Sequence, residues 1–417
     1  MDEIEAAPEG RPPLATRVAG SGTFSSLSLG QFRLLLVGTG AAQVANWMEM
    51  VARGWLVQEL THSAFHLGLI AFVFGISSLI ASPAAGVLTD RVNRQALAAS
   101  TQMLSAAIAL IIGVLVVSGG IELWQLYLTA VISGVSAAVN MPARQVLLYD
   151  VVGVENLTNA IALNSVVANV ARIAAPTVGG AIIAAADIGP AYFTEAGFLL
   201  VATAATLALR ISGSMERTHI PMWQGVRDGF SYVRRDPVLT RLVLLNIVPS
   251  VLIYPYVSLM PLFASQVLDA GPRGYGLLLT GVGFGSIPGG LVIAGMTRNK
   301  GLVMSVAALL YMGLVACFGA SVWFPLSFAI LVFAGVGWSM MAILNQILLQ
   351  LQIADDAVRG RIMAFYTMSN GLTPFGNLTM GVTADQFGVQ PAVAAFALIG
   401  FALAGYLGLG SARIRRL

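Results

Sequence analysis

Ionisable side chains inside apolar segments are the residues of this chain that could do chemistry. Glu49 and Arg53 lie four residues apart in one apolar run, so on a helix they share a face. At membrane depth such groups cost several kcal/mol unless they are paired or hydrated. Glu49 could bind and release a proton, or it could form a permanent ion pair with Arg53. An arginine one turn away favours the ionised carboxylate and therefore the ion pair.

Arg172 lies in a later apolar run, about fourteen residues from its start. It is a candidate for a substrate contact or an interhelix gate, and a structural tie to a neighbouring helix is an equal alternative.

A cluster of charges follows the apolar run 65–88, in the motif Gly86-Val-Leu-Thr-Asp90-Arg91-Val-Asn-Arg94. Only 10% of the residues are charged, so charges just past an apolar run mark a point where the chain leaves a bilayer. A carboxylate at a helix end can also bind the positive N-terminus of another helix. The motif therefore has two interpretations. It could be a gate that closes the protein at one membrane face, or its two arginines could only be retained on the cytoplasmic side of the membrane. The Gly86, Asp90 and Arg94 spacing favours the gate.

Polar and aromatic side chains on four predicted helices are candidates for the lining of a substrate cavity. Taken singly, such residues more often form hydrogen bonds between helices than contacts with a substrate. As a set they predict a mostly neutral, aromatic cavity that suits a bulky amphiphile better than a sugar phosphate. The candidates are Asn46, Asn140, Asn246, Tyr254, Tyr256, Trp338, Asn345 and Gln346. Pro249, Pro255 and Pro261 interrupt one of these helices and can free carbonyl groups toward a cavity.

The composition indicates a polytopic membrane protein. The 417 residues are 57% hydrophobic with a mean hydropathy of +0.83, whereas soluble domains are about half apolar and about a quarter charged. The sequence offers neither a catalytic set near an interface nor a sizeable soluble domain, so an enzyme or a receptor is not expected. The scattered positive charges do not indicate nucleic acid.

No metal or cofactor is expected either. His62 and His66 lack a third ligand for a metal. The sequence contains no phosphate-binding loop, so ATP is not expected to drive the protein.

Twelve apolar runs predict an all-α membrane protein with twelve transmembrane helices in two six-helix bundles. Each span needs about 20 residues. The runs are 33–59, 65–88, 95–118, 122–143, 157–185, 190–210, 238–265, 274–297, 301–320, 323–349, 359–383 and 391–411. The predicted segments are a flexible tail (1–30), a first bundle (31–211), a connector (212–237), a second bundle (238–412) and a basic end (413–417).

The basic residues predict the orientation. If the N-terminus is cytoplasmic, 19 of the 22 Lys and Arg residues fall in the tail, the cytoplasmic loops, the connector or the C-terminal end. Among these residues is Arg144, placed in a loop, and only Arg273 falls in an external loop. Positive charge is retained on the cytoplasmic side, so both termini are expected there.

The two predicted bundles repeat each other. Gly290-x-x-x-Ala294-Gly295-x-x-Arg298 keeps the glycine and the last arginine of the first motif but lacks its aspartate. The fifth and eleventh runs both continue into Pro and Gly residues, which in the fifth are Pro176, Gly179 and Gly180. Parallel repeats of this kind fit a substrate path between the halves and alternating access.

With these residues in view, positions 30–412 resemble the major facilitator superfamily. More narrowly, the chain is similar to the subgroup of enterobactin (siderophore) exporters and macrolide efflux proteins. Besides the Gly86–Arg94 motif, three stretches carry this resemblance: 46–63, Met141-Pro-Ala-Arg-Gln145 with Leu157–Asn164, and Arg359-Gly-Arg-Ile-Met363.

The resemblance implies proton-coupled efflux of a small amphipathic compound, siderophore or drug-like, across the bacterial inner membrane by a monomer. It implies that Asp90 closes the cytoplasmic face against the start of the eleventh helix, which holds Arg359 and Arg361, while Arg91 and Arg94 bind the loops beneath. An importer or uniporter on the same scaffold is the alternative. Antiporter groups often have a fuller Gly-Pro motif in the fifth helix, and here Ala175 precedes Pro176.

Overall fold

The computed structural model describes residues 25–210, 222–353 and 356–417, and among these residues no strand occurs. The first half contains α1 (Gly30–Thr61), α2 (Ala64–Arg91), α3 (Arg94–Ser118), α4 (Leu123–Ala186) and α5 (Ile188–Leu207). The second half contains α7 (Pro237–Val248), α9 (Gly271–Ala294), α10 (Lys300–Ala320), α11 (Phe324–Gln352), α12 (Asp356–Ser369), α13 (Thr373–Phe387), α14 (Val389–Ala404) and α15 (Ala412–Arg415).

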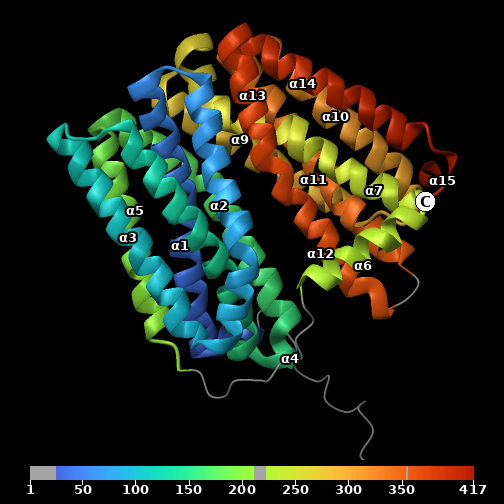
Figure 1. Ribbon diagram of the computed structural model, residues 1–417, viewed down its shortest axis with the longest axis horizontal. Coiled ribbons are helices and arrows are strands. Elements are labelled where there is room, and N and C mark those ends of the chain that lie inside the picture. The colour runs from blue at the N-terminus through green and yellow to red at the C-terminus, as the bar shows by residue number, and fades with distance from the viewer. Residues whose placement is uncertain (1–24, 211–221, 354–355) are drawn as a thin grey trace, which may run out of the picture.

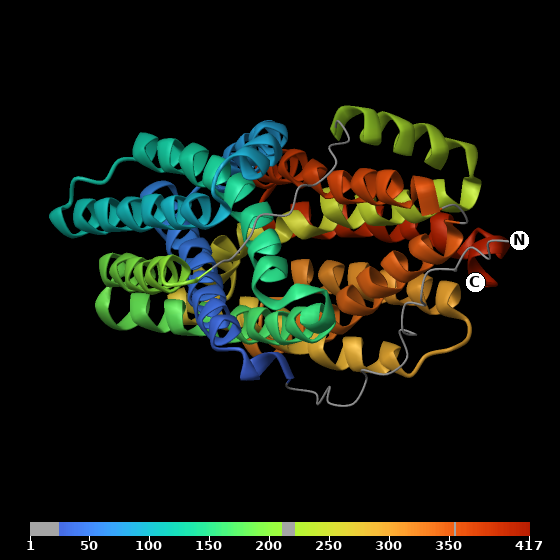
Figure 2. The same cartoon turned by 90° about the horizontal axis from the view of Figure 1, so that it is seen from below.

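The two halves are helical bundles that lie side by side (Figures 1 and 2). They meet at the top of Figure 1 and diverge toward the bottom, where α6 (Met222–Arg235) lies. We call these the closed end and the open end. α1 begins at the open end, so Asn46, Glu49 and Arg53 lie progressively nearer the closed end.

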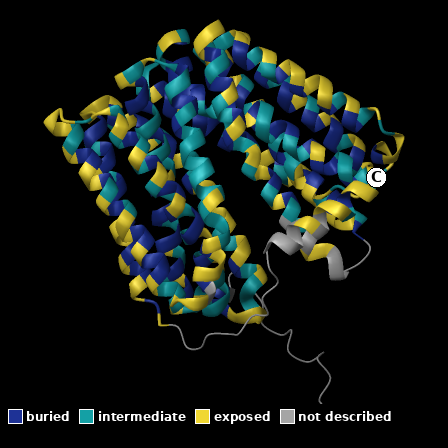
Figure 3. Ribbon diagram, viewed as in Figure 1, coloured by how far each residue is buried: buried dark blue, intermediate teal, exposed yellow. Residues whose placement is uncertain are grey.

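The outer surface of both bundles is apolar, as a bilayer requires. Exposed residues follow the outward faces of the helices, while buried residues fill the bundle interiors (Figure 3). Many of the exposed side chains are large and apolar, such as Ile80, Leu291 and Val322. So much exposed apolar surface is unusual for a soluble protein and indicates contact with lipid.

α4 covers 64 residues and consists of two helices that join at Gly153, which correspond to the predicted runs 122–143 and 157–185. Its backbone departs from helical geometry at Gly153, with φ 68° and ψ 177°. A positive φ is accessible to glycine because it lacks a Cβ, so the chain reverses there with hardly any loop. The expected loop around residues 144–156 is therefore mostly helical.

The proline-rich segment after α7 continues as irregular helix. It consists of the π-helical η2 (Pro249–Ile253), the 3-10 helical η3 (Tyr254–Leu259), the short α8 (Met260–Leu262) and the π-helical η4 (Phe263–Val267). Proline has no N–H to donate to the carbonyl four residues earlier, so the helix adopts other hydrogen-bond patterns there. The prolines interrupt the α-helix as their spacing predicts.

Nine described segments are long and apolar enough to cross a membrane. One of these is α4, which the break at Gly153 divides in two. α1 is not among the nine, and neither is the pair α12 and α13, which the short η5 (Asn370–Leu372) joins. The count of twelve spans therefore stays a prediction, although the helix boundaries follow the twelve apolar runs closely.

Parts of the predicted tail and connector have defined structure. Ser25–Ser28 form the 3-10 turn η1, in which Ser26 N–H donates to Asn159 Oδ1 at 3.2 Å. The connector contains α6, where Phe230 packs edge-on against Phe365 of α12 with ring centroids 5.6 Å apart. Residues 1–24 of the tail and 211–221 of the connector lie outside the described residues.

Glycines bring the two halves into backbone contact at the closed end. A Cβ on Gly68 of α2 would overlap the carbonyl oxygen of Asn377 of α13, and one on Gly276 of α9 would overlap that of Pro176 of α4. Because no side chain intervenes, each pair of helices approaches as closely as backbones allow. A polar contact adds to this closure, since Ser63 Oγ donates to Asp385 Oδ1 at 2.7 Å.

We expect Gly68→Ala to open the closed end. The added methyl group overlaps backbone that cannot rotate away, and overpacking of this kind costs about 1–3 kcal/mol. Spin labels at Glu59 and Gln386, both exposed at the closed end, should move apart in this variant. Replacement of Cys317 by Ser removes the single native cysteine before labelling.

Gly197→Ala is the matched control, because a Cβ on Gly197 meets no atom within 4 Å. Equal label distances in the Gly68 and Gly197 variants would contradict the role given to the glycine contact.

Candidate functional site

A cavity of about 930 Å³ lies between the two halves. Helices α1, α2 and α4 supply most of its wall, and η3, α9 and α13 of the second half contribute the facing residues. It extends from Leu35, Gly86 and Arg144 toward Gly54 and Val57 near the closed end. Its volume is in the range of small-molecule sites, about 300–1,000 Å³.

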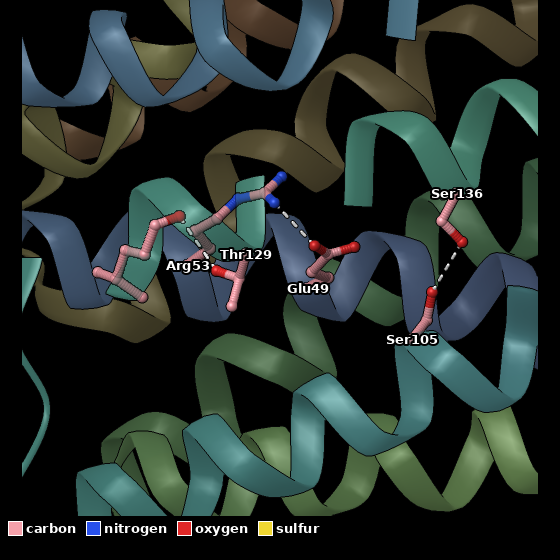
Figure 4. Close-up of polar contacts among 6 residues, drawn as sticks. Glu49, Arg53, Ser105, Thr129 and Ser136 are labelled. Atoms are coloured by element: carbon pink, nitrogen blue, oxygen red, sulfur yellow. Dashed lines mark hydrogen bonds and ion pairs between the residues drawn. The ribbon is translucent and has the colours of Figure 1, made fainter. Parts of the chain in front are cut away.

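Glu49 and Arg53 both line this cavity and form an ion pair. Arg53 Nη1 lies 2.7 Å from Glu49 Oε1, and the two side chains are 15% and 22% exposed. Figure 4 shows the pair along one face of α1. The Arg53 guanidinium also lies over the ring of Phe74 of α2, 5.0 Å from its centroid. The pair that the sequence predicts is present in this conformation, and the cavity gives Glu49 a route to water.

Arg144 is the third charged side chain of the cavity wall. The sequence places it in a loop, but it lies inside α4 because the helix continues to Gly153. Within the described part of the chain, no carboxylate lies within ion-pair distance of Arg144. The wall has few charged side chains, and Arg144 adds to it a positive charge that the sequence analysis placed in a loop.

Three of the eight predicted lining residues, Asn46, Asn140 and Tyr254, lie in the cavity wall. The amide of Asn140 also joins α4 to α3, because its Nδ2 donates to Thr101 Oγ1 at 2.7 Å. One turn earlier on α4, Ser136 Oγ lies 3.4 Å from Ser105 Oγ of α3 (Figure 4). Lining and helix packing are thus not exclusive roles here.

The other five predicted lining residues are not among those that line this cavity. Tyr256 is fully buried and packs edge-on against Phe318 in the second half. Asn345 is buried and donates to the carbonyl of Leu242, so it holds α11 against α7. The remaining three are Asn246, Trp338 and Gln346.

Arg172 lies at the boundary between the halves. Its guanidinium lies over two indole rings, 5.7 Å from the centroid of Trp47 in α1 and 5.2 Å from that of Trp338 in α11. A cation over an aromatic face is attracted by the ring quadrupole, and more strongly where water is excluded. The contact therefore ties the two bundles together and explains how an arginine is accommodated there.

The Gly86–Arg94 motif lies at the open end. Arg94 Nη1 lies 3.1 Å from Asp150 Oδ2 of α4, so this arginine stabilises the first bundle. A Cβ on Gly86 would meet no atom within 4 Å, and Arg91 and Arg359 are both exposed. The side chains of Asp90 and Arg361 lie outside the described residues. The motif and the start of α12 are on separate bundles that diverge at this end (Figure 1).

The predicted helix motif Pro176, Gly179 and Gly180 lies in the second part of α4. Pro176 and Gly180 contact α9 of the other half, and Gly179 lies against Val51 of α1. These residues therefore form part of the closed end.

Two residues of structural note are absent from the sequence predictions. Asp150 forms an ion pair with Arg94. In the sequence it is an isolated acidic residue near a predicted loop, and nothing there indicates its partner. Glu195 lies in α5 and is 3% exposed. Glu195 could have been identified from the sequence, because an acidic residue inside the apolar run 190–210 is unusual for a transmembrane segment.

Comparisons with known proteins agree with this architecture. The model of the transmembrane secretion effector family matches residues 21–414. The staphyloferrin A transporter of Staphylococcus aureus is 22% identical over 86% of this chain and 89% of that protein. The multidrug efflux pump Tap of Mycolicibacterium fortuitum is 24% identical over 88% and 93%.

Among solved structures, a bacterial homologue of the lysosomal transporter Spinster, inward-facing and unoccupied, shares the fold. Its TM-score is 0.71 at 15% identity, over 95% of this chain and 99% of that one. The chain is therefore a membrane transporter of the major facilitator superfamily and belongs to its transmembrane secretion effector family.

Proposed function

We propose that the protein exports a small amphipathic compound, siderophore or drug-like, in exchange for protons by alternating access. The observation that carries this proposal is the 930 Å³ cavity, which is closed at one end by glycine contacts and has a Glu–Arg ion pair in its wall. A carboxylate that reaches the cavity is a group through which proton binding can be coupled to transport.

The distribution of arginines supports a cytoplasmic open end, because α6 and the Gly86–Arg94 motif lie there. The protein then faces the cytoplasm of a bacterial cell, with both termini on that side of the inner membrane. A substrate enters the cavity from the cytoplasm and leaves when the closed end separates.

Closure of the cytoplasmic end requires α2 to approach α12. We infer that Asp90 then meets the N-terminal end of α12 and its arginines, where the helix dipole favours a negative charge. The empty space beside Gly86 is where a closing element can pack.

The cavity wall favours a substrate with an anionic group. Its charges are Glu49 and Arg53, which neutralise each other, and Arg144, which has no such partner in the described chain. Arginine binds carboxylate and phosphate groups with two parallel hydrogen bonds. Apolar residues such as Phe74 and Met141 can hold the rest of an amphiphile.

We expect an imposed pH gradient to drive transport by the purified protein in liposomes, and Glu49→Gln to abolish that response. The amide fills the same volume but cannot exchange a proton. The measurement is uptake of carboxyfluorescein, an anionic amphiphile, and of ethidium, a cationic one, with and without the gradient.

Glu155→Gln is the control, because Glu155 is exposed on α4 beyond the break at Gly153. Proton coupling through Glu49 would be overturned by either of two results. One is wild-type transport that does not depend on the pH gradient, and the other is an equal response to the gradient in the Glu49 and Glu155 variants. Uptake without any gradient response would indicate a uniporter.

We expect Arg144→Gln to weaken carboxyfluorescein binding about tenfold or more, because a charged hydrogen bond contributes about 1.5–3 kcal/mol. Ethidium binding should be unchanged or stronger. Fluorescence titration of the detergent-solubilised protein measures both affinities, and Arg144→Lys should retain part of the anion preference. An equal loss of affinity for the two dyes would instead indicate that Arg144 contributes to the shape of the cavity but does not distinguish anionic from cationic ligands.

A further inference from the structure

A buried carboxyl group in α5 has no evident structural partner. Glu195 is 3% exposed, and its Oε2 is buried without a hydrogen-bond partner in the described chain. Neither of the two ion pairs among the described residues includes it. An ionised carboxylate in such a position is very unfavourable, because nothing replaces the water that it has lost.

The charges that act on Glu195 come from α1. They belong to Glu49 and Arg53, the ion pair of the cavity wall. An α-helix rises about 1.5 Å per residue. On this basis Arg53 lies about 12 Å from the end of α1 at the closed end, and Glu195 lies about 10 Å from the end of α5 on the same side. The guanidinium and the second carboxyl group therefore lie at a similar depth on two helices that pack together.

Other ionisable groups around Glu195 are few. Tyr192 of α5, one turn away and 4% exposed, is within the electrostatic reach of Glu195, Glu49 and Arg53. Helix α3, which also packs against α5, has no ionisable side chain after Arg94 at its start. No charge on α4 acts on Glu195 among the described residues. One cation thus serves two carboxyl groups.

Two carboxyl groups and one guanidinium are neutral together only when one carboxyl group holds a proton. In this conformation Arg53 contacts Glu49 at 2.7 Å, so neutrality of the three groups requires the proton to be on Glu195. If Arg53 turned to Glu195, the ionised carboxylate there would gain its cation, and Glu49 would become the protonated member. Such an exchange keeps the buried charge constant, which avoids the cost of an unpaired ion.

We propose that Glu195 is a second proton-binding residue, which stores the coupling proton and passes it to Glu49 when Arg53 changes partner. The O–H bond of Glu195 breaks as that of Glu49 forms, with no change in the total charge. Glu49, which is 22% exposed in the cavity, then releases the proton to water, and cavity water in place of Arg53 solvates the carboxylate that remains. This inference rests on the proposed proton-coupled function. It assigns the arginine a moving role, whereas a permanent Glu49–Arg53 pair would only hold the helix.

The first test needs no substrate. Infrared difference spectra at neutral pH should show the carbonyl stretch of a protonated carboxylic acid in the wild type. Glu195→Gln should remove this band, while Glu155→Gln should leave it in place. A band that persists unchanged in the Glu195 variant would overturn the proposal, because the proton would then belong to another group.

The second test separates proton coupling from substrate handling in proteoliposomes loaded with carboxyfluorescein. Glu195→Gln mimics the protonated acid, so we expect it to keep dye counterflow, which requires no net proton release. Its pH-gradient-driven accumulation should fall to the level of protein-free liposomes. Glu195→Asp, which still titrates, should recover part of the gradient-driven transport.

The outcomes distinguish this inference from the proposed function. Gradient-driven transport in the wild type with no loss in Glu195→Gln overturns the role of Glu195 alone. Absence of gradient-driven transport in the wild type overturns the proposed function, and with it the transport role of Glu195. Loss of counterflow as well as of gradient-driven transport in the Glu195 variant would show a structural role and contradict proton storage.

Discussion

Close backbone contact between the two halves is the constraint on which the rest of this structure depends. At Gly68 and Gly276 the helices of opposite halves approach so closely that a single methyl group would overlap a backbone carbonyl. Each half is a packed bundle that resists deformation. When the halves meet at one end they therefore diverge at the other, and this geometry produces the cavity between them. Alternating access by rocking requires such contacts to form and break as units.

The low dielectric of the membrane interior is a second constraint, and it determines the surroundings of each arginine. Arg53 has a carboxylate and an aromatic ring, Arg172 has two indole rings, and Arg94 has Asp150. Arg144 instead lines the cavity. Each solution meets the cost of placing a charge away from bulk water. In the proposed transport cycle, the contacts at α1 and between the halves have to break and form again. The same interactions can thus stabilise one conformation and permit another.

The two halves contribute unequally to the cavity. The first half supplies most of the wall, including all three charged side chains. The second half supplies the irregular segment η3, together with residues of α9 and α13. In η3, which contains Pro255, the hydrogen-bond pattern is 3-10 helical; Tyr254 lines the cavity, while Tyr256 packs into the core of the second half. The two halves thus repeat the arrangement of helices, but they do not repeat the charged residues of the cavity wall.

The sequence by itself determined the membrane environment, the approximate helix boundaries and the position of Glu49 and Arg53 on one face of a helix. These properties depend on local composition and on the 3.6-residue helical repeat, which require no knowledge of the fold. The break at Gly153 was harder to predict, because the chain reverses at one glycine without a polar loop. That local event moved Arg144 from a predicted loop into the cavity wall.

Only the tertiary structure decided which polar residues share a site. Asn345 and Tyr256 are residue types that often line cavities, but each packs inside its own bundle. The sequence does not show which residue of an adjacent helix will be the neighbour. Glu195 and Asp150 became significant only when packing placed them beside α1 and Arg94. Which end is closed was likewise decided by contacts between residues about 100 to 300 positions apart in the chain. Those contacts arise from the packing of whole helices, and no local sequence pattern specifies them.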